Sequence, residues 1–492
     1  MPECNGFLYK VRAGDTIVSI SRKHRVRLAV LIKANSQLKD PTRLKRGEKI
    51  CIPLDHGTKQ VTNINYGVEL PGGYKISKFT SNLTFPTGIT FNDIGEMYVI
   101  ESGYKVGPVQ GAARVLKVNP DGSTTEFVRG FNAPVLGIAW YRGYLYISES
   151  GYPGQITKIA SNGTRKTLIR GLPTGGDYGL GEIVFGPGDK MYFGVGSATN
   201  SGVVGSDNGW LAKRPKFHDL TCRSYELVGQ NYVSENPLTP ESGDITVTGA
   251  FQSFGVSVKP DQVVSRNFPY TGAVYEANID GTGLVVYADG LRNPFGLGLG
   301  SGGNLFATDN GMDIRGSRPV ADAPDTFEQV FPGEWYGWPD YSARIPLTDP
   351  RFKPPGGSQP QFLIKNHPPL AEGPVSVFKP HSVPTKFDFS TSDQFGFTGQ
   401  AFIALFGHLY HEGKTLPEQA GFKVVRVNPE TGNVSDFMTV MYPGAENKGP
   451  VHPIQAKFSP NSTELYVVDF GERGDTGKPP TSNSGAIWRI TR

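Results

Sequence analysis

The chain contains no run of 18 apolar residues, so no membrane-spanning helix is expected. Its first twenty residues lack the basic start and the apolar stretch that mark a secretory signal. Cysteine is scarce, with three among 492 residues, which is too few for a disulfide framework, and no Cys/His spacing is that of a zinc site. Phosphate-binding P-loops, HExxH metal motifs and GxSxG nucleophile turns are also missing. The sequence therefore argues against a membrane protein, a zinc protein, a P-loop nucleotide-binding protein and a serine hydrolase.

Glycine and proline are abundant, with 63 and 39 residues, while charged residues make up only 19% of the chain. This composition favours turns and strands over helices, and the length suggests roughly two to four domains. Charge is unevenly spread, because residues 1–56 carry a net charge of +7 and the remainder −3. A basic segment suits an anionic polymer. No nucleic-acid-binding motif accompanies the charge, so nucleic acid is not the expected partner.

The N-terminal residues follow a dense pattern of structural signals. Residues 9–16 predict a short strand, a glycine turn and an Asp–Thr helix cap. Ile17 and Ile20 then share one face of the predicted helix. A second helix is predicted over residues 28–34 and a closing strand over residues 49–52. The order is β-α-α-β.

This pattern over residues 7–54 resembles the LysM carbohydrate-binding module. The resemblance implies binding of N-acetylglucosamine-containing glycans, such as peptidoglycan or chitin. The alternative is a small βααβ domain without a ligand. The two connecting loops are expected to form the glycan groove, with the side chains and turns of Gly14, Asp15, Thr16, Asn35, Gln37, Leu38 and Asp40.

The cysteines and the missing signal bear on where such a module works. Cys4 and Cys51 lie at the two ends of the N-terminal module, on strands that should be neighbours, so a bridge between them fits disulfide geometry, and Cys222 is left as a free thiol.

A wall-binding protein without a classical signal indicates unconventional export, or a role in a cell that builds wall internally, such as a bacterial spore. We therefore expect cytoplasmic synthesis and association with a cell wall or spore envelope.

Beyond residue 55 the pattern changes. Residues 56–73 are polar and glycine-rich and are interpreted as a linker between a domain at 1–55 and one at 74–492. In the second domain a strand pair that ends near an acid, as in residues 88–101, alternates with a hairpin, as in residues 115–122. Six such copies predict a mainly β protein with a six-bladed β-propeller. A tandem of β-sandwiches is the alternative.

The two ends of this domain are expected to meet. The chain ends on residues 486–490, which form only the third strand of the last copy, and residues 74–79 stand alone before the first copy. Pairing these segments would complete the last blade and remove an open sheet edge. Two insertions, at residues 201–272 and 311–384, interrupt the repeat and should crowd one face, where we expect the functional site.

Several segments of the second domain resemble the glucose/sorbosone dehydrogenase family, the soluble quinoprotein propellers. The similar segments are residues 176–192, 290–297, 309–312, 335–339, 380–384 and 421–427. The resemblance spans about residues 80–492. It implies oxidation of a sugar or aldose, with a histidine as general base, hydride passing to pyrroloquinoline quinone, and Ca²⁺ polarising the quinone.

The resemblance assigns roles residue by residue. Arg292 matches the arginine at the quinone and Asn293 its neighbour, so both are cofactor-binding candidates. The calcium candidates are Asp309, Gly311 and Met312. The catalytic candidates are Asp177, Tyr178, Arg292 and His381.

This sequence departs from the family at three places. One of them is Asn132, which stands before the second blade where the family has glutamine. Tyr178 stands where the family has its histidine, and its ordinary pKa near 10 makes it a poor base at neutral pH. Residues 452–454 replace the arginines expected before the last blade. His381 takes over as base only if it reaches the same axis.

Three hypotheses follow. The first is a wall-targeted oxidoreductase, a sugar or aldose dehydrogenase with pyrroloquinoline quinone and Ca²⁺. The second is a non-catalytic propeller scaffold of the wall or spore coat. The third is a metal-dependent lactonase that uses a ring of acids at strand ends, namely Glu101, Glu149, Asp309 and Asp469.

Overall fold

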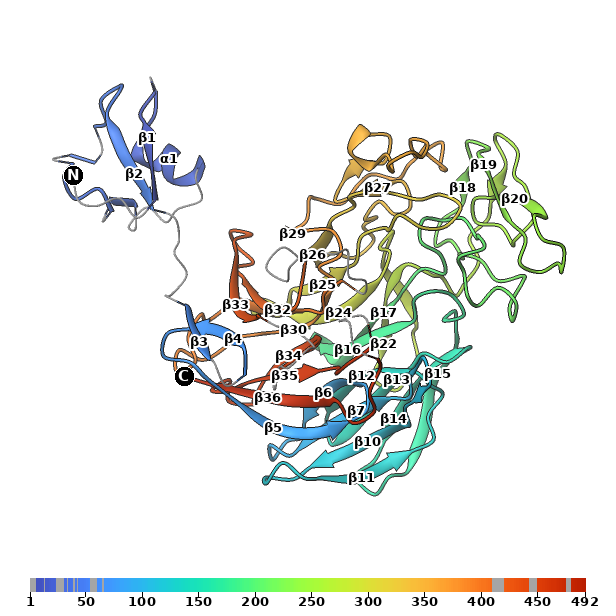
Figure 1. Ribbon diagram of the computed structural model, residues 1–492, viewed down its shortest axis with the longest axis horizontal. Coiled ribbons are helices and arrows are strands. Elements are labelled where there is room, and N and C mark those ends of the chain that lie inside the picture. Colours follow the sequence, from blue (N-terminus) through green and yellow to red (C-terminus); the bar gives the residue numbers. More distant parts are fainter. Residues whose placement is uncertain are drawn as a thin grey trace.

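The computed structural model describes residues 6–12, 14–23, 31–32, 34–38, 40–41, 43–53, 60–63, 66–408, 420–441, 449–474 and 479–492. The protein is mainly β and propeller-like, as predicted, with one α-helix among the elements of these residues (Figure 1). Short 3₁₀ turns occur at η1 (Pro187–Asp189), η2 (Ser301–Gly303) and η3 (Pro350–Phe352). Within the described ranges, no helix has the length and apolar character needed to cross a bilayer.

The N-terminal module contains β1 (Gly6–Lys10), α1 (Ile17–Lys23) and β2 (Lys49–Pro53), and the two strands pair antiparallel. Its small core gathers Tyr9, Val11, Ile17, Ile20, Leu31 and Ile50. Cys51 is disulfide-bonded and Cys222 is free. Cys4 and most of the second predicted helix lie outside the described residues.

Four separate four-stranded antiparallel sheets follow. Their strands, from the inner edge outward, are β6 (Pro86–Phe91), β7 (Met97–Ser102), β10 (Ala113–Val118) and β11 (Thr124–Arg129); β12 (Val135–Tyr141), β13 (Tyr144–Glu149), β14 (Gly154–Ile159) and β15 (Arg165–Leu172); β16 (Leu180–Gly186), β17 (Lys190–Val195), β22 (Ala273–Asn278) and β23 (Val285–Asp289); and β24 (Pro294–Leu299), β25 (Leu305–Asp309), β26 (Asp325–Val330) and β29 (Ser376–Phe378).

The remaining propeller strands form one ten-stranded sheet, so the six separate sheets of the prediction are not all found. In sheet order, its strands are β3 (Gln60–Asn63), β4 (Val68–Pro71), β33 (Val434–Val440), β32 (Lys423–Val427), β31 (Ala401–Leu405), β30 (Pro384–Phe389), β34 (Pro453–Phe458), β35 (Leu465–Asp469), β36 (Gly485–Thr491) and β5 (Lys75–Leu83). A single parallel bridge, Lys386 to Gln455, joins β30 to β34, whereas every other pairing in the sheet is antiparallel.

The inner strands of the sheets pack side by side around an axis. β6 contacts β12, which contacts β16, then β24, β30 and β34, and β34 contacts β6 again. The predicted pairing of the two ends is confirmed, because β5 lies antiparallel to β36 with Ile76 opposite Ile490. The stretch interpreted as a linker differs from its prediction: it contains β3 and β4, and β4 pairs with β33. Val68 and Leu70 are buried there in the same apolar cluster as Phe437.

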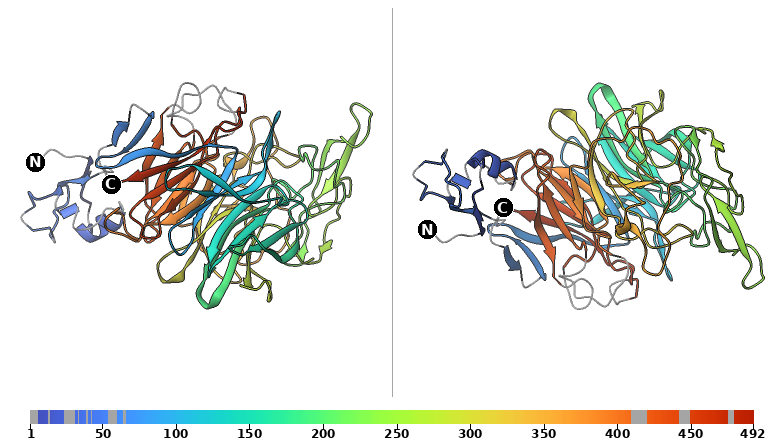
Figure 2. Two further views of the ribbon diagram at one scale, coloured as in Figure 1. Left: turned by 90° about the horizontal axis from the view of Figure 1, so that it is seen from below. Right: turned by 90° about the horizontal axis from the view of Figure 1, so that it is seen from above.

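Short two-stranded ribbons lie outside the main sheets (Figures 1 and 2); among the described residues, three belong to the insertions and one lies between β7 and β10. The ribbons are β8 (Lys105–Val106) with β9 (Val109–Gln110), β18 (Tyr225–Glu226) with β21 (Val263–Val264), β19 (Asn231–Glu235) with β20 (Ile245–Gly249), and β27 (Tyr341–Ser342) with β28 (Ile345–Pro346). The two long insertions share an apolar cluster that includes Phe251, Trp335 and Trp338. The insertions therefore pack against each other.

Candidate functional site

In several sheets an acidic residue stands at the end of the second strand, counted from the inner edge of the sheet. Its carboxylate is hydrogen-bonded to the segment that precedes the inner strand. Each of four carboxylates accepts a backbone N–H from that segment: Glu101 from Thr84 (2.7 Å), Glu149 from Asn132 (2.6 Å), Asp309 from Asn293 (2.6 Å) and Asp469 from His452 (2.8 Å). In the described ranges no three His, Cys, Asp or Glu side chains are grouped as a metal ion would need. The acids therefore fasten loops to sheets, and the interpretation of them as a lactonase metal ring is wrong.

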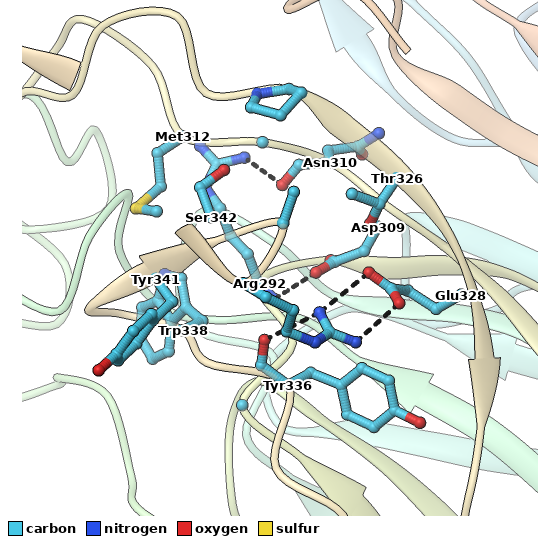
Figure 3. Close-up of a pocket in the computed structure, with 15 residues that line it drawn as sticks. Arg292, Asp309, Asn310, Met312, Thr326, Glu328, Tyr336, Trp338, Tyr341 and Ser342 are labelled. Atoms are coloured by element: carbon cyan, nitrogen blue, oxygen red, sulfur yellow. Dashed lines mark hydrogen bonds and ion pairs between the residues drawn. The ribbon is translucent and has the colours of Figure 1, made fainter. Parts of the chain in front are cut away.

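Asp309 shows this arrangement most fully (Figure 3). Its second oxygen accepts the N–H of Arg292 at 3.1 Å, and burial raises the pKa of Asp309 to about 7. Gly311 donates its N–H to Asp325 at 2.7 Å, and Met312 is buried in the apolar cluster of the insertions. The side chains of the predicted calcium residues thus do not converge on one point, because Asp309 binds the segment before β24 and Met312 packs among apolar residues.

Arg292 is buried, with 3% of its surface exposed. It donates to the backbone oxygen and side-chain oxygen of Asn200 (3.0 and 2.7 Å), to the Asn310 oxygen (3.3 Å) and to Asp313 (2.8 Å). Its guanidinium also lies 4.6 Å from the centre of the Tyr178 ring. Arg292 and Asp309 both line a small polar cavity of about 30 Å³ (Figure 3). Arg292 therefore connects Asn200, directly before the first insertion, to the second insertion.

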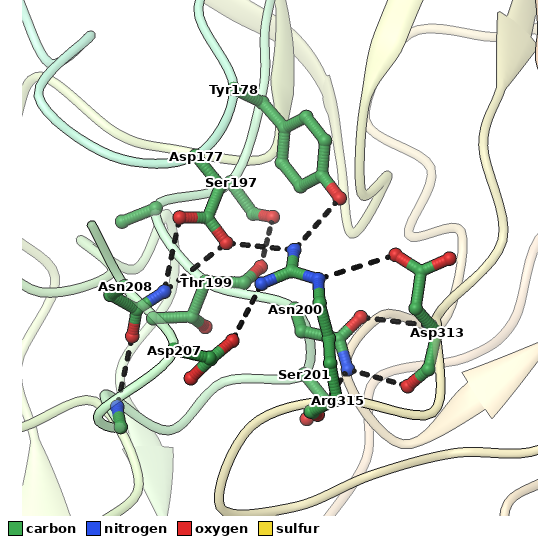
Figure 4. Close-up of polar contacts among 12 residues, drawn as sticks. Asp177, Tyr178, Ser197, Thr199, Asn200, Ser201, Asp207, Asn208, Asp313 and Arg315 are labelled. Carbon is green, nitrogen blue, oxygen red and sulfur yellow. Dashed lines mark hydrogen bonds and ion pairs between the residues drawn. The ribbon is translucent and has the colours of Figure 1, made fainter. Parts of the chain in front are cut away.

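A second arginine, Arg315, stands among three carboxylates (Figure 4). Its nitrogens lie 2.8 Å from Asp177, 2.6 Å from Asp207 and 3.4 Å from Asp313. It also donates to the Tyr178 hydroxyl at 3.1 Å. Because burial raises the pKa of Tyr178 to about 12, that hydroxyl keeps its proton at neutral pH and cannot serve as a base.

Asp177 is fixed from the first insertion as well (Figure 4). Asn208 donates to both of its oxygens at 3.0 and 3.1 Å, and the Trp210 indole donates at 2.9 Å. With the Arg315 ion pair, these donors surround the carboxylate. Asp177 is therefore positioned and charge-compensated.

His381 joins the cluster through Asp313. Its Nδ1 lies 3.3 Å from Asp313, and its ring packs edge-on against His408 at 4.7 Å. Burial alone would raise the pKa of Asp313, but Arg292, His381 and Arg315 hold that pKa below its ordinary range. The structure thus brings the predicted catalytic residues Asp177, Tyr178, Arg292 and His381 together, linked by two residues that the sequence did not indicate, Arg315 and Asp313.

A cavity of about 370 Å³ lies at the end of the axis where the inner strands begin, and we call it the upper cavity. Asp177, Tyr178, Asn293 and Asn310 form a polar wall, and aromatic side chains of Tyr104, Phe295, Phe406 and Phe470 form much of the rest. Lys105 and Arg473 bring positive charge to it. Neither Arg292 nor His381 is among its lining residues. Arg292 lies over the ring of Tyr178, which does line the cavity, and Val383, two residues after His381, lines it as well.

The departure at residues 452–454 is explained by packing. His452 is fully buried, stacks on Phe406 at 4.3 Å and has its Nδ1 3.1 Å from the Phe406 oxygen. Ile454 gives the upper cavity an apolar wall. The cationic side chains of the cavity therefore come from β8 and from the loop after β35.

In the N-terminal module one predicted glycan residue is structural. Asn35 is fully buried, donates to the Leu31 and Cys51 oxygens (2.8 and 2.6 Å) and accepts the Cys51 N–H (2.7 Å). It joins the end of the helical segment to β2 and offers no free group, so its assignment to the groove is wrong.

The other predicted groove residues lie nearer the surface. Asp15 accepts the Tyr9 hydroxyl and the Arg12 N–H, and Leu38 is half-buried against the core. The exposed members of the set are Gly14, Thr16, Gln37 and Asp40.

Comparison with known proteins agrees with both parts of the chain. Residues 9–53 match the LysM domain family. Quinoprotein glucose dehydrogenase B of Acinetobacter calcoaceticus is 22% identical over 304 residues, which cover 53% of this chain; the chain spans about half the length (51%) of that relative.

Solved structures show the same fold. The holo form of the pyranose dehydrogenase PQQ domain from Coprinopsis cinerea is 16% identical, with a TM-score of 0.55 over 89% of this chain and 99% of that one. The calcium structure of the Trichoderma reesei carbohydrate-active enzyme of family AA12 is 15% identical, with a TM-score of 0.51 over 88% of this chain and 99% of that one. The chain is therefore a LysM domain joined to a propeller with the fold of PQQ-type sugar dehydrogenases.

Proposed function

We propose that the propeller is a sugar or aldose dehydrogenase that uses pyrroloquinoline quinone and Ca²⁺, and that the LysM domain holds it on an N-acetylglucosamine-containing glycan such as peptidoglycan. The observation that carries the proposal is the upper cavity. It combines an aromatic lining, cationic side chains and the Asp177–Tyr178 pair at one end of a propeller axis.

The proposal includes the organisation of the chain. β30–β33 and the set β34, β35, β36 and β5 each have the strand order of a blade, and one bridge joins them. Counting them as two blades gives six, in accord with the closed circle of inner strands. We place the glycan-binding domain at residues 1–55 and the propeller at 74–492, with the β3–β4 hairpin of the intervening segment attached to the propeller edge.

The residues of the upper cavity suit the proposed cofactor. Pyrroloquinoline quinone is flat, aromatic and anionic; Phe406, Phe470 and Tyr104 would contact its ring faces, and Lys105 and Arg473 its carboxylates. Gly311 and Met312 line the neighbouring cavity of about 30 Å³ rather than the upper cavity, and their backbone carbonyls would supply the oxygen ligands that Ca²⁺ prefers. When bound, the quinone supplies a two-electron acceptor for hydride from the sugar.

His381 is the residue we propose to accept the sugar hydroxyl proton. Tyr178 is excluded by its raised pKa, whereas His381 is 31% exposed and paired with Asp313. A carboxylate behind an imidazole orients the ring and stabilises its protonated form. Asp313 is held in place for this role by Arg292 and Arg315.

The second candidate function is a non-catalytic scaffold of the wall or spore coat. It is favoured by Arg292, whose guanidinium is committed to Asn200, Asn310 and Asp313 rather than to the upper cavity. In that case the cavity would bind a ligand without turnover. Cofactor binding alone does not separate the two functions, so turnover decides between them.

The cofactor proposal predicts a specific loss on mutation. Calorimetric titration of the protein with pyrroloquinoline quinone in the presence of Ca²⁺ should show saturable binding. Arg473→Ala should weaken the binding of the quinone. The loss of one charge-assisted contact, about 1.5–3 kcal/mol, corresponds to roughly a 10- to 100-fold higher Kd. Arg142→Ala, at an exposed ion pair with Asp189 far from the cavity lining, is the matched control. A Kd unchanged by Arg473→Ala, or no binding by the wild type, would refute the assignment.

The LysM proposal predicts sedimentation. The full chain should pellet with insoluble peptidoglycan or chitin, while a chain of residues 60–492, which keeps all described propeller strands, should remain in the supernatant. Substitution of Gln37 and Asp40 together by alanine should release much of the bound fraction, because both side chains are exposed in the predicted groove. Equal pelleting of the full and truncated chains would show that the domain does not provide the attachment.

A further inference from the structure

Exposed basic side chains gather at one end of the ribbon that β1 and β2 form in the N-terminal module. Lys10 and Lys49 stand directly opposite each other in the register of the two strands, and both are exposed. The preceding pair, Tyr9 and Ile50, is buried in the small core. Because successive side chains of a strand alternate between its two faces, the two lysines point away from that core. The outer face of the ribbon therefore ends in a pair of like charges.

The chain segments next to this pair add three more cations. The backbone pairing continues one step beyond the lysines, because Gly47 donates its N–H to the Val11 oxygen at 2.8 Å. Arg12 follows Val11 along the chain and is exposed. Lys45 and Arg46 precede Gly47, and both are exposed. These positions are therefore neighbours in space. We call the set the basic ridge, and its members are Lys10, Arg12, Lys45, Arg46 and Lys49.

The acids beside the basic ridge are hydrogen-bonded to backbone rather than paired with its side chains. Asp15 accepts the backbone N–H of Arg12 at 2.7 Å, and Glu48 accepts that of Lys45 at 2.9 Å. Among the residues that the structure describes, no carboxylate forms an ion pair with a side chain of the ridge. Like charges directly opposite each other on two strands are destabilising. The ridge therefore carries uncompensated positive charge that an external polyanion would neutralise.

The density of this charge indicates the kind of partner. Cations that neutralise a polymer with a charge on every short repeat unit release its condensed counterions, whereas a neutral glycan gives no such gain. No exposed aromatic residue is found among the described side chains of the module, so nucleic-acid bases have no surface on which to stack. The helix α1 contributes no residue to the ridge, so no helix is placed to enter a DNA groove. These features favour a polyanion without bases.

From these features we propose that the basic ridge binds a linear phosphodiester polymer, a polyol phosphate of the kind joined to wall glycans. The ridge would be a second binding surface of the N-terminal module, and it shares no residue with the exposed part of the predicted groove, which is Gly14, Thr16, Gln37 and Asp40. The choice of a wall polymer rests on the proposed attachment to a wall glycan. The groove would bind the neutral sugars of the wall, and the ridge would bind its anionic polymer.

Calorimetric titration of the full chain with soluble poly(glycerol phosphate), without quinone or Ca²⁺, tests the ridge. Over a series of salt concentrations, log Kd should rise with log salt with a slope of roughly 3–4, from five contacts at about 0.7 each. The triple variant Lys10→Gln, Lys45→Gln, Lys49→Gln should have a roughly 3- to 100-fold higher Kd at low salt, from the loss of three exposed charge pairs. Its salt slope should fall to roughly 1–2, since two contacts remain.

A matched variant removes the same net charge elsewhere. Lys213→Gln, Lys259→Gln, Lys353→Gln changes three exposed lysines of the propeller and should keep the wild-type Kd and salt slope. The ridge variant should keep the wild-type thermal midpoint and should still pellet with chitin, which is neutral. Failure of the groove would abolish pelleting with chitin, so it is distinguishable from failure of the ridge.

Three results would overturn the proposal. The first is a wild type that does not bind poly(glycerol phosphate) at low salt. The second is a propeller variant that loses as much affinity as the ridge variant, because the effect would then come from net charge alone. The third is tighter binding of a short duplex DNA than of poly(glycerol phosphate) at the same salt concentration, which would make nucleic acid the partner of the ridge.

Discussion

A chain that starts at residue 84 should fail to form a stable propeller, whereas one that starts at residue 60 should melt like the intact propeller. The first deletion removes β5, the outer partner of β36, and with it the buried side chains of Ile76 and Leu83. Truncation of one buried Ile or Leu to alanine costs about 2–5 kcal/mol. Loss of both, with the backbone partners of a whole strand, approaches the total stability of a typical domain, about 5–15 kcal/mol.

Thermal unfolding and size-exclusion chromatography of the two truncated chains measure this effect. A third chain that starts at residue 74 loses β3 and β4 but keeps β5, and it should fall between the other two because Val68 and Leu70 are also buried. A midpoint for residues 84–492 within a few degrees of that for residues 60–492 would show that β5 does not close the propeller.

Arg292→Ala should destabilise the protein by about 1.5–3 kcal/mol, the contribution of hydrogen bonds made by a charged group. The substitution removes the donors to both oxygens of Asn200 and one of the cations beside Asp313, which is 33% exposed and keeps Arg315 and His381 as neighbours. Arg292→Lys should recover only part of the loss, since an ammonium cannot reproduce the planar fork of donors. The free energy of unfolding in urea gives the measurement.

The matched control is again Arg142→Ala. Its guanidinium is 63% exposed, so the ion pair with Asp189 should contribute less than about 1 kcal/mol. If Arg292→Ala unfolds at the wild-type urea concentration, the contacts of Arg292 with Asn200 and the second insertion do not stabilise the fold, and its role would be confined to ligand binding.

The repeating parts of the chain could be predicted because each strand carries its own signal. The alternation of apolar residues and the turn residues between them gave the inner strand pairs and the pairing of β5 with β36. β3 and β4 were missed because they lie in a polar, glycine-rich stretch, and the strand against which β4 pairs, β33, lies far along the chain. Local pattern does not reveal such a partner.

The site could be predicted only in part, for a similar reason. Motif similarity found Arg292, Asp177 and Tyr178, but Arg315 reaches Tyr178 across 137 residues from an insertion without periodic pattern. The acids at the strand ends were misread because a carboxylate in that position looks the same in sequence whether it binds a metal or a backbone N–H. Asn35 was misread likewise, since a polar loop residue gives no sign that its amide will be buried against Cys51.

The central claim, that the upper cavity supports sugar oxidation, is tested most directly by absorbance. The protein is loaded with pyrroloquinoline quinone and Ca²⁺ without oxygen, and D-glucose and other aldoses are added. The account predicts that the quinone spectrum changes to that of the reduced form, and that His381→Asn binds quinone with the wild-type Kd but reduces the cofactor roughly 10²- to 10⁴-fold more slowly. A spectrum that stays oxidised with every aldose, although the quinone is bound, would contradict the dehydrogenase and leave the propeller as a binding scaffold.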